Sequence, residues 1–199
     1  MKQTDVIAYF DAHAPSWDAE MICSEALVDA ILRRALLTEH PDVLDVACGT
    51  GVLFPYYLRC GAKTVTAIDI SPAMAQIARQ KTAGLPIEVL CGDAQVYPFQ
   101  KKFDAVMVYN AFPHFPEPKK LIAALSGLLR PGGTLTVAHG MSRAAIARHH
   151  EGSAARVSLE LPAARQVADW MAPYCTVTTV IDTDAMYQVT GILKEELCL

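Results

Sequence analysis

Val43-Leu44-Asp45-Val46-Ala47-Cys48-Gly49-Thr50-Gly51 is the most informative segment of this 199-residue chain. It predicts a buried strand over residues 43–47 that runs into a glycine turn and then into a helix. Because glycine has no Cβ, Gly49 and Gly51 let the backbone bend sharply and approach a ligand closely. A negative side chain at Asp45 favours a ligand with positive charge and hydroxyl groups over a pyrophosphate. The segment therefore indicates the charge of the ligand.

Strand-like and helical segments alternate through the first two thirds of the chain. Apolar runs predict further strands over residues 64–69, 87–91, 103–109 and 134–138. Helical patterns fill the gaps between them, over residues 52–60, 72–83 and 117–129. This alternation predicts a doubly wound α/β fold with a largely parallel sheet.

The C-terminal part follows a different pattern. Helices are expected over 142–150 and 162–172, before two alternating runs over 175–182 and 185–193. The second run is expected to return antiparallel beside the first and to leave an uncovered edge strand. The prediction is a seven-stranded, mostly parallel sheet with an antiparallel last strand. Residues 1–199 are expected to form one domain, with a helical cap over 1–40 and the α/β core over 41–199.

Composition excludes several classes of protein. The chain is 52% hydrophobic and carries 17 basic against 21 acidic residues, which gives little attraction to nucleic acid. Six scattered cysteines without a CxxC pair favour reduced thiols that fill space in the interior. No secretory signal is recognised, and no run approaches the roughly 18 apolar residues of a membrane span. A cytoplasmic protein with no membrane or nucleic-acid partner is expected.

Polar residues stand where the predicted strands end, and this is the edge at which open α/β sheets bind ligands. Asp69 lies 18 positions after Gly51, close to the spacing at which such domains place an acid against ribose hydroxyls. The alternative role for Asp69 is a cap on the helix that begins near Pro72. Asp93 is suited to accept from an exocyclic amine such as that of adenine, and its alternative is a turn aspartate after Gly92.

These motifs, taken together, resemble those of class I S-adenosylmethionine-dependent methyltransferases of the small-molecule type. The resemblance covers residues 40 to 140. Its motifs, in order, are Asp45-Val-Ala-Cys-Gly-Thr-Gly51, Val65-Thr-Ala-Ile-Asp-Ile-Ser-Pro72, Cys91-Gly-Asp-Ala94, Phe103-Asp-Ala-Val106 and Leu129-Arg-Pro-Gly-Gly-Thr-Leu135.

The resemblance implies a role for each strand end. The loop from Asp45 to Gly51 would hold the methionine part of S-adenosyl-L-methionine, Asp69 the ribose, and Asp93 with Ala94 the adenine. Asn110 or its neighbour would lie near the transferable methyl group. The implied donor-binding residues are Asp45, Ala47, Gly49, Gly51, Asp69, Ile70, Met74, Asp93, Ala94 and Asn110.

The chain departs from the family pattern at two places. Ala47 replaces the first glycine of the usual loop, as some subgroups tolerate. The stretch Asn110-Ala-Phe-Pro113 lacks the Asn-Pro-Pro-Tyr-like tetrad of enzymes that methylate nucleic-acid amino groups, so DNA and RNA bases are not expected as substrates. Residues Tyr9 to Asp18 resemble the leading helix of small-molecule methyltransferases, which closes over the cofactor.

A nicotinamide dinucleotide is the rival cofactor. Its fingerprint G-x-G-x-x-G needs a third glycine where the helix packs against the strand. From Gly49 this chain reads Gly49-Thr-Gly51-Val-Leu-Phe54, and Phe54 cannot fill that role. An oxidoreductase is therefore the weaker alternative.

Histidines are the candidate catalytic groups on the acceptor side. Methyl transfer from a sulfonium is an in-line displacement, so a base is needed only for an acceptor that is protonated at working pH. His114 and His139 follow adjacent strands of the predicted sheet and are expected to face one cavity, although a structural role for each stays open. His149 and His150 end the next helical stretch, but adjacent helix positions point about 100° apart and seldom bind one ion. No metal site is expected.

Aromatic side chains complete the expected acceptor site. A lid is predicted from Tyr9, Phe10 and Trp17, with Phe112 and Phe115 on the opposite wall, and the alternative is that these residues anchor the N-terminal helix to the sheet. The favoured function is methyl transfer from S-adenosyl-L-methionine to a small-molecule substrate by a monomer or homodimer. The alternatives are a non-catalytic S-adenosylmethionine-binding module, methyl transfer to a metal-bound or corrinoid acceptor, and an NAD-dependent oxidoreductase.

Overall fold

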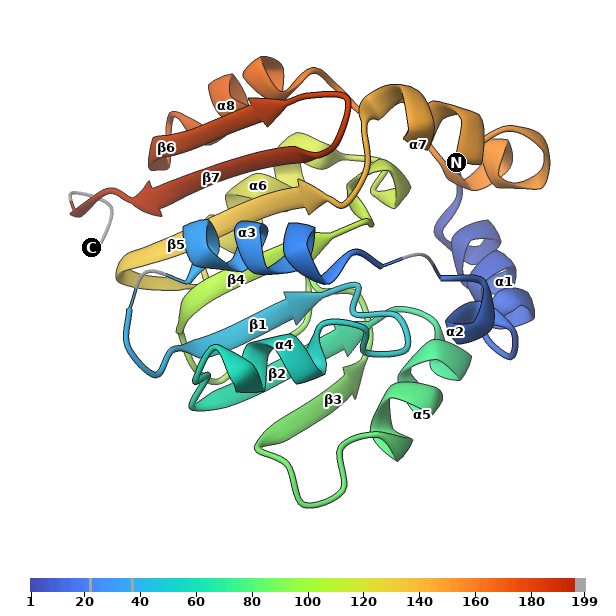
Figure 1. The fold of residues 1–199 in the computed structure, drawn as a ribbon, viewed down its shortest axis with the longest axis horizontal. Coiled ribbons are helices and arrows are strands. Elements are labelled where there is room, and N and C mark those ends of the chain that lie inside the picture. The colour runs from blue at the N-terminus through green and yellow to red at the C-terminus, as the bar shows by residue number, and fades with distance from the viewer. Residues whose placement is uncertain (22, 37, 196–199) are drawn as a thin grey trace.

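A seven-stranded sheet forms the centre of the computed structural model, which describes residues 1–21, 23–36 and 38–195. The strand order is β3-β2-β1-β4-β5-β7-β6. The first five strands pair in parallel, and β7 runs antiparallel between β5 and β6. This confirms the predicted sheet with its antiparallel last strand (Figure 1). The strands are β1 (Asp42–Val46), β2 (Thr64–Asp69), β3 (Ile87–Cys91), β4 (Phe103–Tyr109), β5 (Leu129–His139), β6 (Cys175–Asp182) and β7 (Tyr187–Leu193).

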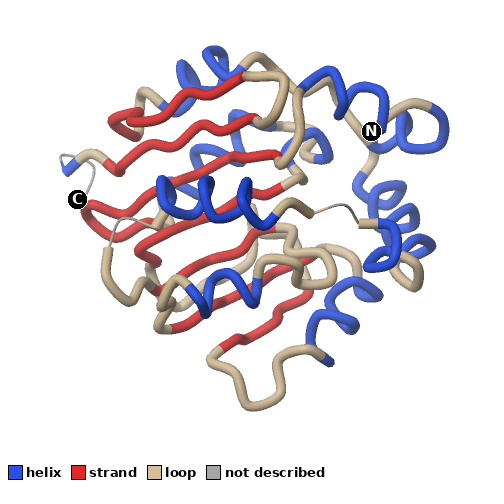
Figure 2. Tube along the Cα trace, in the orientation of Figure 1, coloured by secondary structure: helices blue, strands red, loops and turns tan. Residues whose placement is uncertain are grey.

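Helices cover both faces of the sheet because neighbouring strand residues point to opposite sides. Leu44 and Val46 of β1 pack in one core cluster with α6 (Pro118–Ser126) and α8 (Ala164–Met171). Val43, one position away, packs on the other face with α3 (Glu25–Ala35), α4 (Phe54–Arg59) and α5 (Pro72–Gln80). Figure 2 shows the continuous sheet with α3 and α4 crossing in front of it.

The N-terminal 40 residues divide between two places. The helices α1 (Gln3–His13) and α2 (Trp17–Glu20) lie at the carboxyl ends of the parallel strands, as does α7 (Arg143–His149) (Figure 1). In contrast, α3 packs on the sheet through Val28, Ile31, Leu32 and Ala35, whose spacing places them on one helix face. Only α1 and α2 therefore occupy the position expected for a cap.

The position of the edge strand differs from the prediction. The second C-terminal run, β7, lies inside the sheet, and β6 forms the edge beyond it. Six of the seven residues of β7 are buried, whereas buried or half-buried residues alternate with exposed ones along β6. A strand with neighbours on both sides and helices on both faces is buried along its length. The polar side chains of β7, Gln188 and Thr190, are accommodated there by hydrogen bonds to Ile31 and Thr136.

The border between α6 and β5 also lies elsewhere than expected. The helix ends at Ser126, and β5 begins at Leu129 rather than at residue 134. The pairing with β4 shifts register between Phe103 and Ala105, so residues 130–133 are accommodated as an irregularity within the strand. Residues 130–133, which lie between the expected helix and the expected strand, are therefore part of β5.

Two further observations concern the chain as a whole. Cys23, Cys48, Cys60, Cys91 and Cys175 are free thiols, and Cys198 lies outside the described residues. No helix among the described residues has the length and apolar character to cross a membrane.

Candidate active site

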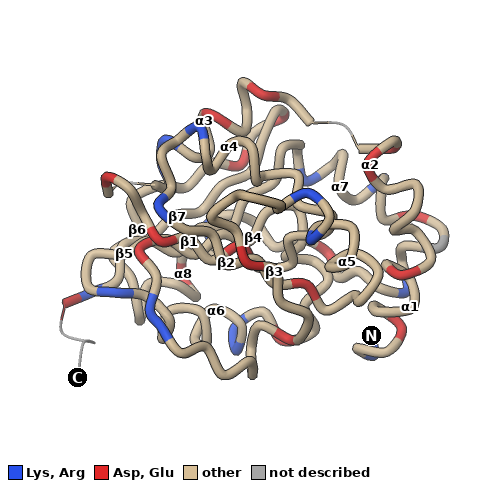
Figure 3. Tube along the Cα trace, turned by 90° about the horizontal axis from the view of Figure 1, so that it is seen from below, with Lys and Arg blue, Asp and Glu red and all other residues tan. Residues whose placement is uncertain are grey.

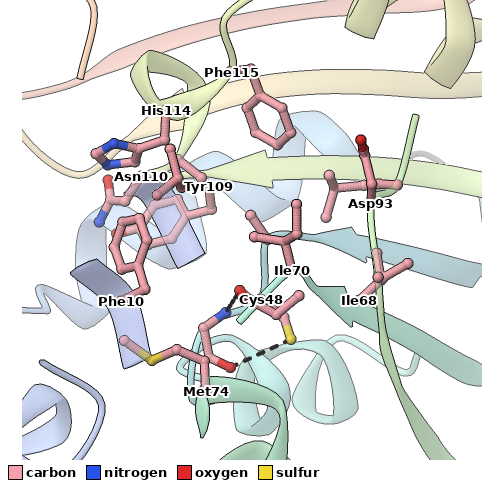
Figure 4. Close-up of a pocket in the computed structure, with 18 of the residues that line it drawn as sticks. Phe10, Cys48, Ile68, Ile70, Met74, Asp93, Tyr109, Asn110, His114 and Phe115 are labelled. Atoms are coloured by element: carbon pink, nitrogen blue, oxygen red, sulfur yellow. Dashed lines mark hydrogen bonds between the residues drawn. The ribbon is translucent and has the colours of Figure 1, made fainter. Parts of the chain in front are cut away.

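A cavity of about 300 Å³ lies at the carboxyl ends of β1 to β4 (Figure 4). Each of these strands contributes the residues that follow it directly, as expected for an open α/β sheet. Eight of the ten predicted donor-binding residues line the cavity, namely Ala47, Gly49, Asp69, Ile70, Met74, Asp93, Ala94 and Asn110. The other two, Asp45 and Gly51, do not line it.

The turn after β1 takes backbone conformations that favour glycine. Ala47, Gly49 and Gly51 have φ angles of 55°, 56° and 87°. Ala47 therefore stands in a left-handed conformation at the position where the family pattern has glycine. A Cβ on Gly51 would lie 2.3 Å from Cε2 of Phe54, so this glycine makes room for the first residue of α4. Gly51 shapes the turn and does not contribute to the cavity wall.

Asp45 occupies a different place from the one predicted. Its position in β1 directs the side chain to the face that α4 covers, and it is 2% exposed. Burial raises the pKa of its carboxyl to about 8, while the neighbouring Tyr57 hydroxyl opposes that shift. The carboxyl is therefore largely protonated at neutral pH, and it does not supply the negative charge beside the ligand that the sequence suggested.

Asp69 supports the loop and also faces the cavity. Its two carboxylate oxygens accept hydrogen bonds from the backbone N–H groups of Gly49 and Ser71, each at 2.8 Å. Burial raises the pKa of this carboxyl to about 6, and the backbone donors oppose the shift. Because each carboxylate oxygen can accept more than one hydrogen bond, Asp69 keeps acceptor capacity for a ligand. The helix cap considered as the alternative role is wrong, because Ser71 is the N-cap of α5 and its hydroxyl accepts from the Met74 N–H at 3.1 Å.

Asp93 contacts a residue that the sequence reasoning did not identify. One carboxylate oxygen accepts from the backbone N–H of Gln95 at 2.9 Å, and the other accepts from Nε2 of Gln3 at 2.8 Å. Gln3 lies on α1 and lines the cavity. No local sequence pattern predicts this contact, because 90 positions separate the two residues.

Two aspartates tie the N-terminal segment to the strand ends. Asp11 on α1 accepts hydrogen bonds from the Ser71 hydroxyl at 2.5 Å and from the Ala73 N–H at 3.1 Å. Asp18 on α2 accepts from the Thr50 hydroxyl at 2.5 Å and pairs with the Lys81 ammonium at 2.6 Å. These contacts hold α1 and α2 over the cavity.

The aromatic residues of this segment line the space beneath it. Trp17 lines the cavity, and its Nε1 would be 3.7 Å from a Cβ placed on Gly49. Phe10 on α1 packs edge-to-face on His114, with ring centroids 4.9 Å apart. Figure 4 shows Phe10 and His114 side by side at one end of the cavity.

A second cavity of about 260 Å³ adjoins the first. The two share five lining residues, namely Phe10, Trp17, Met21, Asn110 and His114. All four histidines singled out in the sequence line this second cavity, together with Tyr9. Phe112 does not line it, because its ring is 1% exposed and packs in the core beneath α6 and α8. The predicted aromatic wall at this position is therefore wrong.

His114 stands where the two cavities meet. Its Nδ1 lies 2.8 Å from the carbonyl oxygen of Val157, at the end of the 3-10 turn η2 (Gly152–Val157). A carbonyl only accepts, so Nδ1 carries the proton and Nε2 keeps its lone pair. Burial lowers the pKa of His114 to about 4, and repulsion from His150 adds to the shift while the Val157 carbonyl opposes it. The imidazole is thus neutral at physiological pH.

His139 lies deeper than His114. It is 2% exposed, and its Nε2 has no hydrogen-bond partner among the described residues. Burial lowers its pKa to about 3, and the neighbouring imidazoles of His114 and His150 contribute. His139 lines only the second cavity. The described residues contain no group of three or more histidine, cysteine or acidic side chains placed to hold a metal ion.

Comparison with known proteins finds similarity to methyltransferases. A family model for a methyltransferase domain matches residues 43–133. The ubiquinone biosynthesis O-methyltransferase of Xanthomonas campestris pv. campestris (strain B100) is 38% identical over 100 residues, which cover 47% of this chain and 40% of that protein. The demethylmenaquinone methyltransferase of Renibacterium salmoninarum is 33% identical over 143 residues, covering 67% of this chain and 58% of that protein. The chain spans about half the length of these relatives.

A solved structure shows the same fold. The N-methyltransferase NodS from Bradyrhizobium japonicum WM9, in complex with S-adenosyl-L-homocysteine, superposes with a TM-score of 0.75. The match covers 96% of this chain and all of that one, at 16% sequence identity. At this identity the comparison speaks for the fold alone.

Proposed function

We propose that this chain is a class I S-adenosylmethionine-dependent methyltransferase that transfers a methyl group from S-adenosyl-L-methionine to a small-molecule acceptor. The observation that carries the proposal is the pair of adjoining cavities that meet at His114. The first suits the donor, and the second suits the acceptor. Methyl transfer needs the two reactants in line and shielded from water, which adjoining cavities under one lid provide.

The first cavity fits an adenosyl sulfonium in its chemistry. Asp69 and Asp93 offer carboxylate oxygens beside the ends of β2 and β3, where a ribose and an amine need acceptors. No lysine or arginine lines this cavity within the described residues, so it lacks the cations that a pyrophosphate would need. These features favour the donor over a nicotinamide dinucleotide. When bound, S-adenosylmethionine supplies an electrophilic methyl group on its sulfonium.

His114 is the proposed general base. Its Nε2 lone pair is free of the Val157 contact, and its ring borders both cavities. It would accept the proton that the acceptor loses as the methyl group is transferred. His139 does not line the first cavity, and we therefore assign it no direct part in this proton transfer.

Titration calorimetry with S-adenosylmethionine and S-adenosylhomocysteine tests the donor site. Binding below the millimolar range is expected, and Asp69→Ala should weaken it at least about tenfold through lost hydrogen bonds to the ribose. Asp169→Asn, at an exposed position on α8, serves as the control and should bind normally. Equal affinity of Asp69→Ala and wild type would show that Asp69 serves only the loop.

The base is tested by the pH dependence of turnover. His114→Gln should lower kcat by about 10²- to 10⁴-fold while donor affinity stays unchanged. Because the pKa of His114 lies at about 4, its imidazole remains neutral above pH 5. The kcat of the wild type should therefore stay level from pH 5 to 8 and decline only below pH 5. A kcat that falls between pH 7 and 6 would contradict this assignment.

A non-catalytic binding module is the second candidate function. It shares the donor cavity and differs only in lacking turnover. Incubation with methyl-labelled donor and pools of cell metabolites separates the two, because labelled product appears only if the chain is an enzyme. Binding without product in any pool would favour the module.

A further inference from the structure

The second cavity has a lining that is mostly apolar, and few of its polar groups carry a fixed charge. Aromatic and aliphatic side chains form part of the wall, with Tyr9 and Trp17 contributed by α1 and α2 and Ile146 by α7. Among the described residues no lysine or arginine lines it, and Glu20, an exposed residue, is the only acid that does. Arg148, which directly precedes His149, is exposed and does not line the cavity, and Arg143 faces Glu160 and Asp182 instead.

Burial disfavours the charged form of three histidines of this cavity. It lowers the pKa of His114, His139 and His150, repulsion from His150 adds to the shift of the first two, and repulsion from His149 adds to that of His150. The rings of His114 and His150 lie 5.1 Å apart between centroids. An anionic acceptor would lose its hydration here without gaining a fixed cation, which is unfavourable.

Neutral imidazoles and an amide instead suit a ligand with a hydroxyl group. The lone pair on Nε2 of His114 accepts a proton donor. Asn110 borders the same junction, and its Oδ1 is already occupied by the N–H of Gly140 at 3.0 Å. Its amide N–H₂ takes no part in that contact and can donate to a ligand. A hydroxyl can satisfy both groups, because it donates one hydrogen bond and accepts others.

We propose that the second cavity takes an uncharged, ring-bearing acceptor, held by a hydroxyl group at His114 and Asn110, and discriminates against anionic acceptors. This rests on the proposed function and adds the chemical class of the acceptor. The aromatic walls favour a flat ring, and the neutral polar groups favour the hydroxyl.

The reaction balances with the groups named. The hydroxyl proton passes to Nε2 of His114, and the hydroxyl oxygen forms a bond to the methyl carbon of S-adenosylmethionine. The carbon–sulfur bond breaks, and its electron pair stays on sulfur to give S-adenosylhomocysteine. The products are a methyl ether and a protonated His114, which returns its proton to solvent.

Two probes that share one ring system test the class of acceptor. Protein saturated with S-adenosylhomocysteine is titrated at pH 7 with 2-naphthol and with 2-naphthoate. The neutral naphthol should bind at least about tenfold more tightly, and with labelled S-adenosylmethionine it should give the methyl ether. Equal or tighter binding of naphthoate would overturn the proposal, as would the failure of both probes to bind below the millimolar range.

A substitution in the wall tests the cause of the preference. Met141 lines the second cavity, and Met141→Lys would place a cation there. Naphthoate affinity should then rise at least about tenfold, whereas Met141→Leu, which conserves volume, should keep the wild-type preference. An unchanged preference in a folded Met141→Lys protein would show that wall charge does not select the acceptor.

The donor titration distinguishes failure of the proposed function from failure of the proposed acceptor class. If S-adenosylhomocysteine fails to bind, the proposed function is wrong. If it binds normally and the two probes show no preference for naphthol, only the acceptor class is wrong.

Discussion

At the scale of single residues, the turn after β1 is the most constrained part of the molecule. It places left-handed residues at Ala47, Gly49 and Gly51 within five positions, and only the first carries a Cβ. Left-handed backbone costs a residue with a Cβ about 1–2 kcal/mol. The turn thus combines backbone strain at the cavity wall with a tight contact to α4.

An added Cβ can destabilise a left-handed glycine position through backbone strain and through a steric clash, and comparing Gly51 with Gly132 separates these two effects. Both have a left-handed φ, of 87° and 74°, but an added Cβ at Gly132 meets nothing within 4 Å. Gly132→Ala should therefore lower the free energy of unfolding by about 1 kcal/mol through strain alone. Gly51→Ala adds the clash with the buried Phe54 ring, so its loss should reach about 3 kcal/mol or more in urea denaturation. Similar losses for the two variants would contradict the clash.

The buried carboxyl of Asp45 should give the ligand-free protein a measurable pH dependence. Its pKa is about 8 in the folded state and near 4 in the unfolded state, so the folded chain binds more protons between these values. This contribution to stability is full below pH 4 and is lost as pH rises through 8, by up to about 1.4 kcal/mol per pH unit.

Asp45→Asn should remove that contribution. Urea denaturation of wild type and variant at pH 5, 6.5 and 8 should show the variant gaining stability relative to wild type as pH rises. The exposed substitution Asp169→Asn should follow the wild-type trend at all three values. A difference between wild type and Asp45→Asn that does not change with pH would mean that the carboxyl ionises normally.

At the scale of elements, α1 and α2 form a cover that is held by polar contacts at its edges. Figure 3 shows acidic positions on α1 and α2 at the end of the molecule that carries the cavities. Asp11 and Asp18 reach the loops after β1 and β2, and Gln3 reaches Asp93 after β3. Since the first cavity lies beneath these helices, movement of the cover would control access to it.

Asp18→Asn should loosen this cover without unfolding the core. The Asp18–Lys81 pair is half exposed, so it contributes at most about 1 kcal/mol. Its loss should raise the hydrogen-exchange rate of α1 amides up to about fivefold, while amides of β1 and β4 stay protected. Lys120→Ala on α6, which breaks an exposed pair with Glu117, is the control and should leave α1 unchanged. Unaltered exchange on α1 in Asp18→Asn would show that the pair does not hold the cover.

At the scale of the whole molecule, the strand order brings together residues that are far apart in sequence. β1 lies between β2 and β4, so the ends of these strands, with that of β3, surround one space. His114 and His139 meet at the second cavity because β4 and β5 are neighbours. The sequence predicted this convergence, since strand ends in a doubly wound sheet share one edge.

The errors in the sequence-based site have a common cause. Asp45 and Phe112 carry side chains typical of a ligand site, yet both point into the core. Their direction depends on which face of the sheet or turn is covered by a helix, and this information is not local. Gln3, Asp11 and Asp18 went unassigned as contacts for the same reason, because each bonds a partner at least 32 positions away.

The sequence by itself determined the sheet, its parallel character, the antiparallel last strand and most residues at the strand ends. It could do so because apolar periodicity and glycine turns act over a few neighbouring residues. Only the tertiary structure decided that β6 is the edge, that Asp45 is buried, that α3 covers the sheet and that the proton of His114 sits on Nδ1. Each of these depends on contacts between distant segments, and burial and hydrogen bonding at such contacts set the charge and direction of a side chain.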